Sequence, residues 1–100
     1  MAKMLVFTNA LDGWDEEFNR WYDEIHLPEV LTLPVFSGAE RFRLADAQMF
    51  AGQRFRYLAI YEYRGTAAAA LEALMGAAGG FRMTDAMSPE VHVSLFEPTA

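Results

Sequence analysis

The sequence predicts an α+β fold of the ferredoxin-like plait, in which an antiparallel sheet carries two helices on one face. The predicted elements follow the order β-α-β-β-α-β, and the two β-α-β halves have similar lengths. One hundred residues, about half of them apolar, are enough to bury one hydrophobic core but not two. We therefore expect residues 1–100 to form a single domain.

The first predicted element is a strand over residues 3–8, KMLVFT, a short apolar run rich in strand-forming residues. Asn9 and the Asp12-Gly13 pair follow it, and such residues are typical of turns.

The next element is an amphipathic helix over residues 15–27, in which apolar residues recur with the helical period. Asp12 or Asp15 is expected to cap it, because a carboxylate suits the positive N-terminus of a helix. Pro28 has no backbone N–H, so we expect the helix to kink or restart there, with residues 29–33 as an extra turn.

Two strands are predicted next, one over residues 39–44 and a longer one over residues 54–64, RFRYLAIYEYR. The intervening residues 45–53 are expected to form a hairpin loop. Thr66 then caps an alanine-rich helix over residues 67–78, which ends at Gly79-Gly80. Residues 81–89 are predicted to form a loop and residues 90–97 the last strand.

Alternation along the longest strand divides its side chains between two faces of the sheet. We expect the aromatic face to point away from the helices and the other face to point toward them. The expected outer set is Phe55, Tyr57, Ala59, Tyr61 and Tyr63, and the expected inner set includes Leu58, Ile60 and Glu62. An aromatic sheet face without helices should be covered, so we predict a homodimer joined sheet to sheet.

The composition argues against several classes of partner. The formal charge is −6 and no basic run occurs, so neither nucleic acid nor an anionic membrane is expected to bind. No apolar run approaches the roughly 20 residues of a membrane span, and the N-terminal stretch does not resemble a secretory signal. The absence of cysteine excludes disulfides and thiolate catalysis. We expect a cytoplasmic protein.

The helix over residues 15–27 carries the best candidates for chemistry. Counting about 100° per residue, Phe18, Tyr22 and Ile25 lie together in the buried stripe. Trp21 falls on one shoulder of that stripe and His26 on the opposite shoulder, one turn after Tyr22. Histidine titrates near neutral pH and can both take and return a proton, whereas a purely structural histidine near the helix end is the alternative.

Other polar residues are candidates with simpler structural interpretations. Glu62 is expected to face the helices and either act on a substrate or pair with Arg41 or Arg43 on the neighbouring strand. Asn9 could present its amide near the mouth of the same cavity, although asparagine commonly ends a strand. Asn19 is expected at an exposed rim.

A metal site is not expected, because the two histidines lie on different elements and no ligand spacing is present. Phosphate-binding loops and dinucleotide fingerprints are also missing, since the glycine-rich stretch follows a helix rather than preceding one. We expect no cofactor.

The segment from residue 18 to 43 resembles the pattern of the EthD-like branch of the dimeric α/β-barrel superfamily. In that branch a helix carries an aromatic pair and a histidine before a proline, and then leads into a strand with an arginine-aromatic pair. The matching residues are Trp21, Tyr22, His26, Pro28, Arg41 and Phe42.

The resemblance implies a dimeric α/β barrel with a cavity between helices and sheet, where histidine and tyrosine move protons. Relatives include isomerases, cyclases, cofactor-free monooxygenases, heme-degrading enzymes and proteins without assigned chemistry. On this basis His26 and Tyr22 are the predicted catalytic residues of an isomerase, cyclase or lyase acting on a small hydrophobic aromatic or polyketide-like substrate. Trp21, Phe18 and Ile25 would form its apolar wall.

Two alternative functions stay open beside this one. One is a non-catalytic protein that binds a small molecule or supports a partner enzyme, and the other is a cofactor-free monooxygenase. Heme binding in relatives uses a histidine, but no second feature of this sequence supports it.

Overall fold

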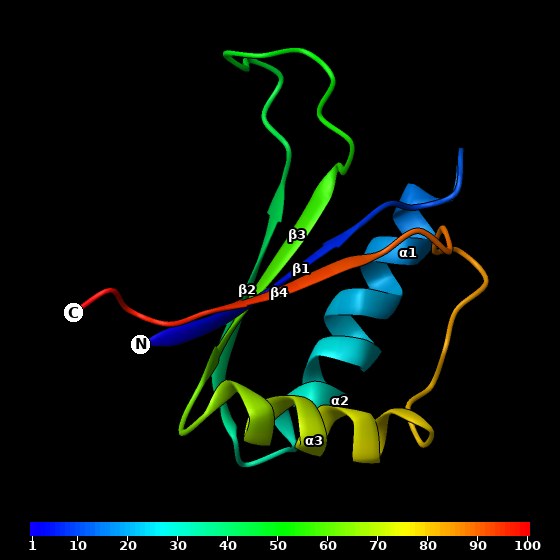
Figure 1. Cartoon of the computed structure of the whole chain (residues 1–100). Helices are drawn as coiled ribbons and strands as arrows, with labels where there is room; N and C mark the ends of the chain where they lie inside the picture. Colours follow the sequence, from blue (N-terminus) through cyan, green and yellow to red (C-terminus); the bar gives the residue numbers. More distant parts are fainter.

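The computed structural model describes all 100 residues and has the predicted ferredoxin-like plait (Figure 1). Four antiparallel strands form one sheet in the order β2-β3-β1-β4. Figure 1 shows the helices together on one side of this sheet. The elements are β1 (Ala2–Thr8), α1 (Asp15–Trp21), η1 (Tyr22–His26), α2 (Leu27–Leu31), β2 (Phe36–Arg43), β3 (Tyr57–Tyr63), α3 (Ala67–Ala78) and β4 (His92–Phe96).

Local sequence signals predict the ends of α3 correctly, but they do not predict how α1 begins. The range of α3 is the predicted one, and the Thr66 side chain caps it by accepting a hydrogen bond of 3.1 Å from the Ala69 N–H. The prediction that Asp12 or Asp15 caps α1 is wrong, because Trp14 occupies the N-cap position and no side chain caps this end. The Asp15 carboxylate instead accepts a hydrogen bond from a tyrosine hydroxyl of the sheet.

The first helical region runs through Pro28 as α1, a π-helical turn (η1) and α2. In η1 the Leu27 N–H bonds to the Tyr22 carbonyl, five residues back. Pro28 lacks an N–H, and its ring would crowd the carbonyl four residues earlier in a regular α-helix. The wider π turn accommodates it, so the chain continues into α2 from Leu27 without a break.

The predicted facing of β3 is wrong. Tyr57, Tyr61 and Tyr63 are buried under the helices, whereas Leu58 and Ile60 point to the open face of the sheet. Both faces of this strand are apolar, so the alternation identifies a strand without saying which face is inside. Tyrosine tolerates the inner face because its ring is apolar and its hydroxyl finds a partner there.

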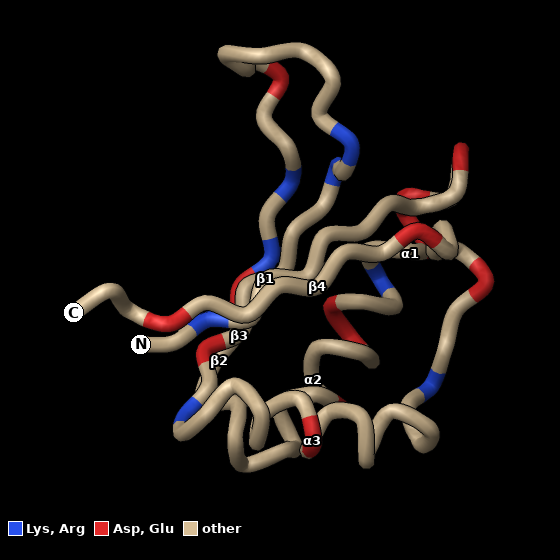
Figure 2. The backbone as a smooth tube through the Cα atoms, in the orientation of Figure 1, with Lys and Arg blue, Asp and Glu red and all other residues tan.

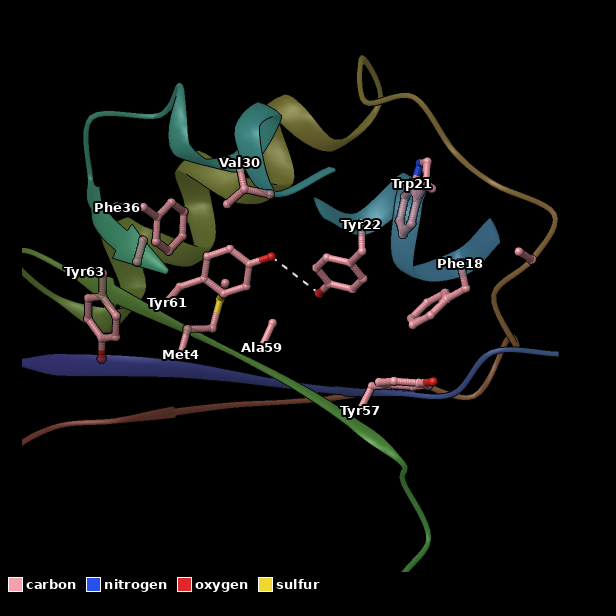
Figure 3. Packing of buried hydrophobic residues seen from close by; sticks show 12 residues of the cluster. Met4, Phe18, Trp21, Tyr22, Val30, Phe36, Tyr57, Ala59, Tyr61 and Tyr63 are labelled. Atoms are coloured by element: carbon pink, nitrogen blue, oxygen red, sulfur yellow. Dashed lines mark hydrogen bonds between the residues drawn. The ribbon is translucent and has the colours of Figure 1, made fainter. Parts of the chain in front are cut away.

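The core lies between the sheet and the helices (Figure 3). Figure 3 shows aromatic side chains from the helical region meeting the tyrosines of β3 and Met4 of β1. Phe18 is fully buried and packs against Tyr57, with ring centroids 5.2 Å apart. No helix of the chain has the length and apolarity needed to cross a bilayer.

A long hairpin, residues 44–56, projects beyond the sheet between β2 and β3 (Figure 1); we call it the arm. Its tip residues Met49 and Phe50 are 88% and 71% exposed. Figure 2 shows basic positions on the returning side of the arm near its base and on the adjoining end of β2. The Asn9 amide braces this base, because it donates to the Arg54 carbonyl at 3.0 Å and accepts from the Arg56 N–H at 2.8 Å.

Candidate functional site

The candidate site is centred on Tyr22, which η1 places against β3. Figure 3 shows the hydroxyls of Tyr22 and Tyr61 pointing toward each other, and Tyr61 donates to Tyr22 at 3.4 Å. Both side chains are buried. Because the Tyr22 oxygen accepts this bond, its own proton remains free to be donated to another group.

Arg41 of β2 reaches the same tyrosine from the sheet. It stands opposite Ala59 in the β2–β3 register, on the face that the helices cover. Its guanidinium carbon lies 4.3 Å from the centroid of the Tyr22 ring, and its side chain is 12% exposed. Nη1 donates to Asp23 at 2.9 Å and Nη2 to Asn19 at 2.8 Å, whereas the buried Nε–H has no acceptor.

His26, the last residue of η1, contacts the same Tyr22 ring from the helical side. Its imidazole stacks on Trp21 at 4.7 Å and meets the Tyr22 ring edge to face at 5.1 Å. Phe81, from the loop after α3, covers it at 5.7 Å. The Nδ1 atom is buried and has no hydrogen-bond partner.

The placement of Trp21 and His26 on opposite shoulders is therefore wrong, and the π turn explains why. Five residues of a regular α-helix turn the chain through about 500°, which would leave these two side chains about 140° apart. A π turn bonds residue i to i+5, so residues five apart come close to a full turn and lie side by side. Here that geometry stacks the two rings.

Two buried side-chain nitrogen atoms in this chain lack a hydrogen-bond partner, and both flank Tyr22. They are Nδ1 of His26 and Nε of Arg41. Buried polar groups are nearly always paired, because an unpaired one loses its hydration without compensation. Two such atoms around one tyrosine indicate a place where a polar ligand group would be stabilised.

Burial decides the protonation of this cluster. Desolvation lowers the pKa of His26, and the nearby Glu29 carboxylate opposes that shift only in part, so the neutral imidazole is favoured. Desolvation also raises the pKa of Tyr22 and, far above its usual range, that of Tyr61. Both phenols therefore stay protonated and act as hydrogen-bond donors, whereas His26 is the group that can accept a proton near neutral pH.

A hydrogen-bonded chain extends from Arg41 along the helix–sheet interface. Asn19 accepts from Arg41 and donates to the Tyr57 hydroxyl at 3.4 Å. Tyr57 in turn donates to Asp15 at 2.6 Å. This polar chain was not predicted from the sequence, because it depends on the inward facing of Tyr57 and on the β2–β3 register.

The predicted apolar wall is only partly assembled. Phe18 is fully buried beside Tyr22, with ring centroids 5.6 Å apart. Trp21 packs on His26 and donates its indole N–H to the Arg82 carbonyl at 2.9 Å. Ile25 lies farther out, where it lines with Trp21 and Met83 a shallow groove of about 350 Å³.

Two predicted site residues lie elsewhere. The prediction that Glu62 faces the helices is wrong: it points to the open face and pairs with Lys3 at 3.2 Å. Since it shares the parity of Ile60 rather than that of Tyr61, it cannot reach Arg41. The Asn9 amide is engaged by the backbone at the base of the arm and does not join the His26 cluster.

The cluster is closed in this structure. Five surface hollows lie beside this cluster or elsewhere on the molecule, and none of these five is lined by Tyr22, His26 or Arg41. The loop over residues 79–89 covers His26 through Phe81 and is held by Trp21 at the Arg82 carbonyl and by Glu29 at the Arg82 N–H. No group of three or more histidine and carboxylate residues is arranged to hold a metal ion.

The chain has a ferredoxin-like α+β fold, and two solved structures share this fold. A solved structure of a mutant of MhuD, with two manganese protoporphyrin IX molecules bound per active site, is similar over 100% of this chain and 96% of its own, with a TM-score of 0.69 and 14% identity. An EthD family protein from Bacillus halodurans C-125 matches over 99% of this chain and 100% of its own, with a TM-score of 0.58 and 14% identity.

These similarities concern the fold, and they confirm the predicted ferredoxin-like plait. No protein-family model matches the sequence. No curated protein matches it either.

Proposed function

We propose that this protein binds a small hydrophobic aromatic or polyketide-like molecule at the Tyr22 cluster and moves a proton on it through His26. The observation that carries the proposal is that two nitrogen atoms next to the Tyr22 side chain, Nδ1 of His26 and Nε of Arg41, are buried without a hydrogen-bond partner. The reaction class is that of an isomerase, cyclase or lyase, in which a carbon-bound proton is removed and then returned.

In this proposal neutral His26 is the general base. It accepts a proton from a carbon next to a carbonyl or on a phenolic ring, and the carbonyl or phenol oxygen gains negative charge. The imidazolium then returns the proton at another carbon or at the oxygen. Its lowered pKa supports the first step, because a base must be unprotonated at the working pH.

Arg41 and Tyr22 would stabilise the negative oxygen. The guanidinium already has its two terminal nitrogens fixed by Asp23 and Asn19, and its buried Nε–H is the donor left over. The Tyr22 hydroxyl, bonded to Tyr61 through its oxygen, has a proton to donate. Fixed donors in a desolvated site stabilise developing charge strongly.

Access to this cluster requires the loop over residues 79–89 to move away from His26. Phe81 is the side chain that covers the imidazole, and Met83 at the surface of the same loop is 67% exposed. Gly79-Gly80 precedes the covering segment, so the chain can turn there with little steric restriction.

The porphyrin carried by one structural neighbour does not fit the residues present here. An axial histidine needs a ring nitrogen that faces space wide enough for the macrocycle. In this chain the imidazole is stacked on Trp21 and lies edge to face against Tyr22 and Phe81, and none of the five surface hollows described above borders it. We therefore derive no step through a porphyrin.

We also propose that the protein is a homodimer joined through the open face of the sheet. The facing of β3 found here changes the residues of that interface from the predicted tyrosines to Leu58 and Ile60, with Leu5, Phe42 and Phe96 from the other strands. Phe42 and Phe96 are 41% and 58% exposed, and such a face is typical of a protein interface.

The experiment is a measurement of hydrogen–deuterium exchange at carbon for a panel of aromatic ketones and phenols in D₂O, followed by mass spectrometry. This readout detects proton transfer before the physiological substrate is known. Native protein is expected to exchange 2-tetralone or a related ketone with saturation. His26→Gln is expected to slow that exchange about 10²- to 10⁴-fold, the usual contribution of a positioned acid/base.

His92→Gln is the matched control, because His92 is exposed and lies on the opposite face of the sheet. It should exchange at the native rate, and circular dichroism should show that both variants are folded. Equal exchange by native protein and His26→Gln would overturn the proposal. Saturable quenching of tryptophan fluorescence without any exchange would favour the binding protein, and oxygen consumption would favour the monooxygenase.

A further inference from the structure

The loop over residues 79–89 is tied to the rest of the molecule differently at its two ends. It begins at Gly79-Gly80, where the backbone has little steric restriction. Its far end is fixed to the segment after β1 by two backbone hydrogen bonds of 2.8 Å, one at the Ala86 carbonyl and one at the Ser88 N–H. The residues between these ends cross over His26.

Between its two ends the loop is held at Arg82. The Arg82 N–H donates to both carboxylate oxygens of Glu29, at 3.0 and 3.3 Å, and its carbonyl accepts from the Trp21 indole N–H at 2.9 Å. Residues 83–85 form no hydrogen bond with the helices or the sheet. The backbone of one residue is therefore the latch of this loop.

We propose that Glu29 is a positioning residue for His26: it latches this loop over the imidazole, and its negative charge stabilises the imidazolium that forms when His26 accepts a proton. The inference rests on the proposed function, in which His26 is the base and the loop must open. It assigns the opening to the breaking of the hydrogen bonds at Arg82.

The contacts of the latch connect it directly to the imidazole. Phe81, the residue before Arg82, covers His26 with ring centroids 5.7 Å apart, and Trp21 stacks on it at 4.7 Å. Breaking the bonds at Arg82 would free Phe81 to leave the imidazole while Trp21 stays stacked on it. Glu29 forms the stronger half of the latch, because a hydrogen bond to a carboxylate is stronger than one to a neutral acceptor.

Glu29 also lies where its charge acts on His26. It follows His26 by three residues in the continuous helical region, and residues at this spacing lie on the same side of a helix. Burial lowers the pKa of His26, and the half-buried Glu29 carboxylate raises it. The other titratable groups nearby are the Tyr22 phenol, which contacts the imidazole, and the Arg41 guanidinium, which lies against the Tyr22 ring. The loop contributes the backbone of Arg82, whose side chain belongs to an exposed residue.

The first measurement is the rate at which diethyl pyrocarbonate modifies His26, followed by peptide mass spectrometry at about pH 8, where the imidazole is neutral. Glu29→Ala should raise this rate about tenfold, the effect of losing a hydrogen bond to a charged group. Glu29→Gln keeps a carbonyl acceptor for the Arg82 N–H and should raise it less. Trp21→Phe keeps an aromatic ring but lacks the indole N–H, so it gives a second measurement of the latch and should also raise the rate.

The second measurement is an NMR pH titration of the His26 ring. Glu29→Gln should lower the titration midpoint, because the carboxylate no longer favours the imidazolium. Glu24→Gln is the matched control, since Glu24 is an exposed glutamate of the same helical region that does not bond to Arg82. It should leave the modification rate and the titration midpoint at their native values.

Two results would overturn the inference. The first is modification of His26 at the native rate in both Glu29→Ala and Trp21→Phe, and the second is the same His26 midpoint in Glu29→Gln as in Glu24→Gln. Neither measurement needs a substrate, so each can succeed where the proposed function fails. If native protein exchanges protons at carbon, the pH profile of that exchange should move in Glu29→Gln to lower pH together with the NMR midpoint.

Discussion

Replacing Arg41 by methionine should destabilise the fold and show what holds η1 against β2. Methionine keeps most of the apolar length of the arginine stem but removes the guanidinium. The variant therefore loses the hydrogen bonds to Asn19 and Asp23 and the contact with the Tyr22 ring. Its core packing is otherwise retained.

The magnitude follows from these contacts. Hydrogen bonds to charged groups contribute about 1.5–3 kcal/mol each when buried. The bond to Asp23 counts for less, about 0.2–1 kcal/mol, because that carboxylate is 60% exposed and screened by water. Removing a buried charge also recovers its desolvation penalty, which offsets part of the loss. We expect a net decrease of about 1–2 kcal/mol, or a fall in Tm of about 4–16 °C for a domain of this size.

Urea denaturation followed by circular dichroism measures this change, and Arg43→Met is the matched control. Arg43 is on the same strand, two residues further along, but it is exposed and unpaired, so its replacement should change stability by less than about 0.5 kcal/mol. Equal stabilities of the two variants would refute the reasoning. A more stable Arg41→Met protein would mean that burial of the guanidinium costs more than its contacts return, as for a residue kept for function.

Two further predictions concern His26 and the open face. Because burial lowers the pKa of His26, the unfolded chain takes up a proton more readily than the folded one, so the free energy of unfolding is highest above about pH 6.5 and falls as the pH drops below it. Urea midpoints at about pH 7.5 and about pH 5 should therefore differ more for native protein than for His26→Gln, and equal differences would contradict the pKa shift. If the proposed homodimer forms through the open face, Ile60→Asp should lower the mass measured by light scattering to that of a monomer, whereas Met75→Asp on the exposed side of α3 should not. A native mass for Ile60→Asp would remove the proposed interface.

The elements were largely predictable because each carries local signals. Thr66 before the alanine run and the glycine pair after it define α3 without reference to the rest of the chain. Pro28 likewise predicts an interruption, and the structure contains one. Such signals act through the backbone within a few residues, so they do not depend on tertiary packing.

The geometry of the site was less predictable, for two physical reasons. Both faces of β3 are apolar, so nothing local decides that Tyr57 and Tyr61 lie inside and Glu62 outside. The π turn also changes the helical phase, which brings Trp21 onto His26 although regular α-helical counting separates them. Arg41 was assigned to the site from the resemblance of the sequence, whereas its partners Asn19 and Asp23 depend on the packing of helix against sheet.

The unpaired nitrogens are the strongest argument that Tyr22 marks a functional site. An unsatisfied buried polar group costs about 1–3 kcal/mol, and a domain of this size is stable by only about 5–15 kcal/mol. A leucine at position 26 would fill a purely structural role without that penalty. The chain instead holds a neutral imidazole and a cation against one phenol whose proton is free. A base, an anion-stabilising group and a hydrogen-bond donor in contact with one another are the parts that proton transfer at carbon requires.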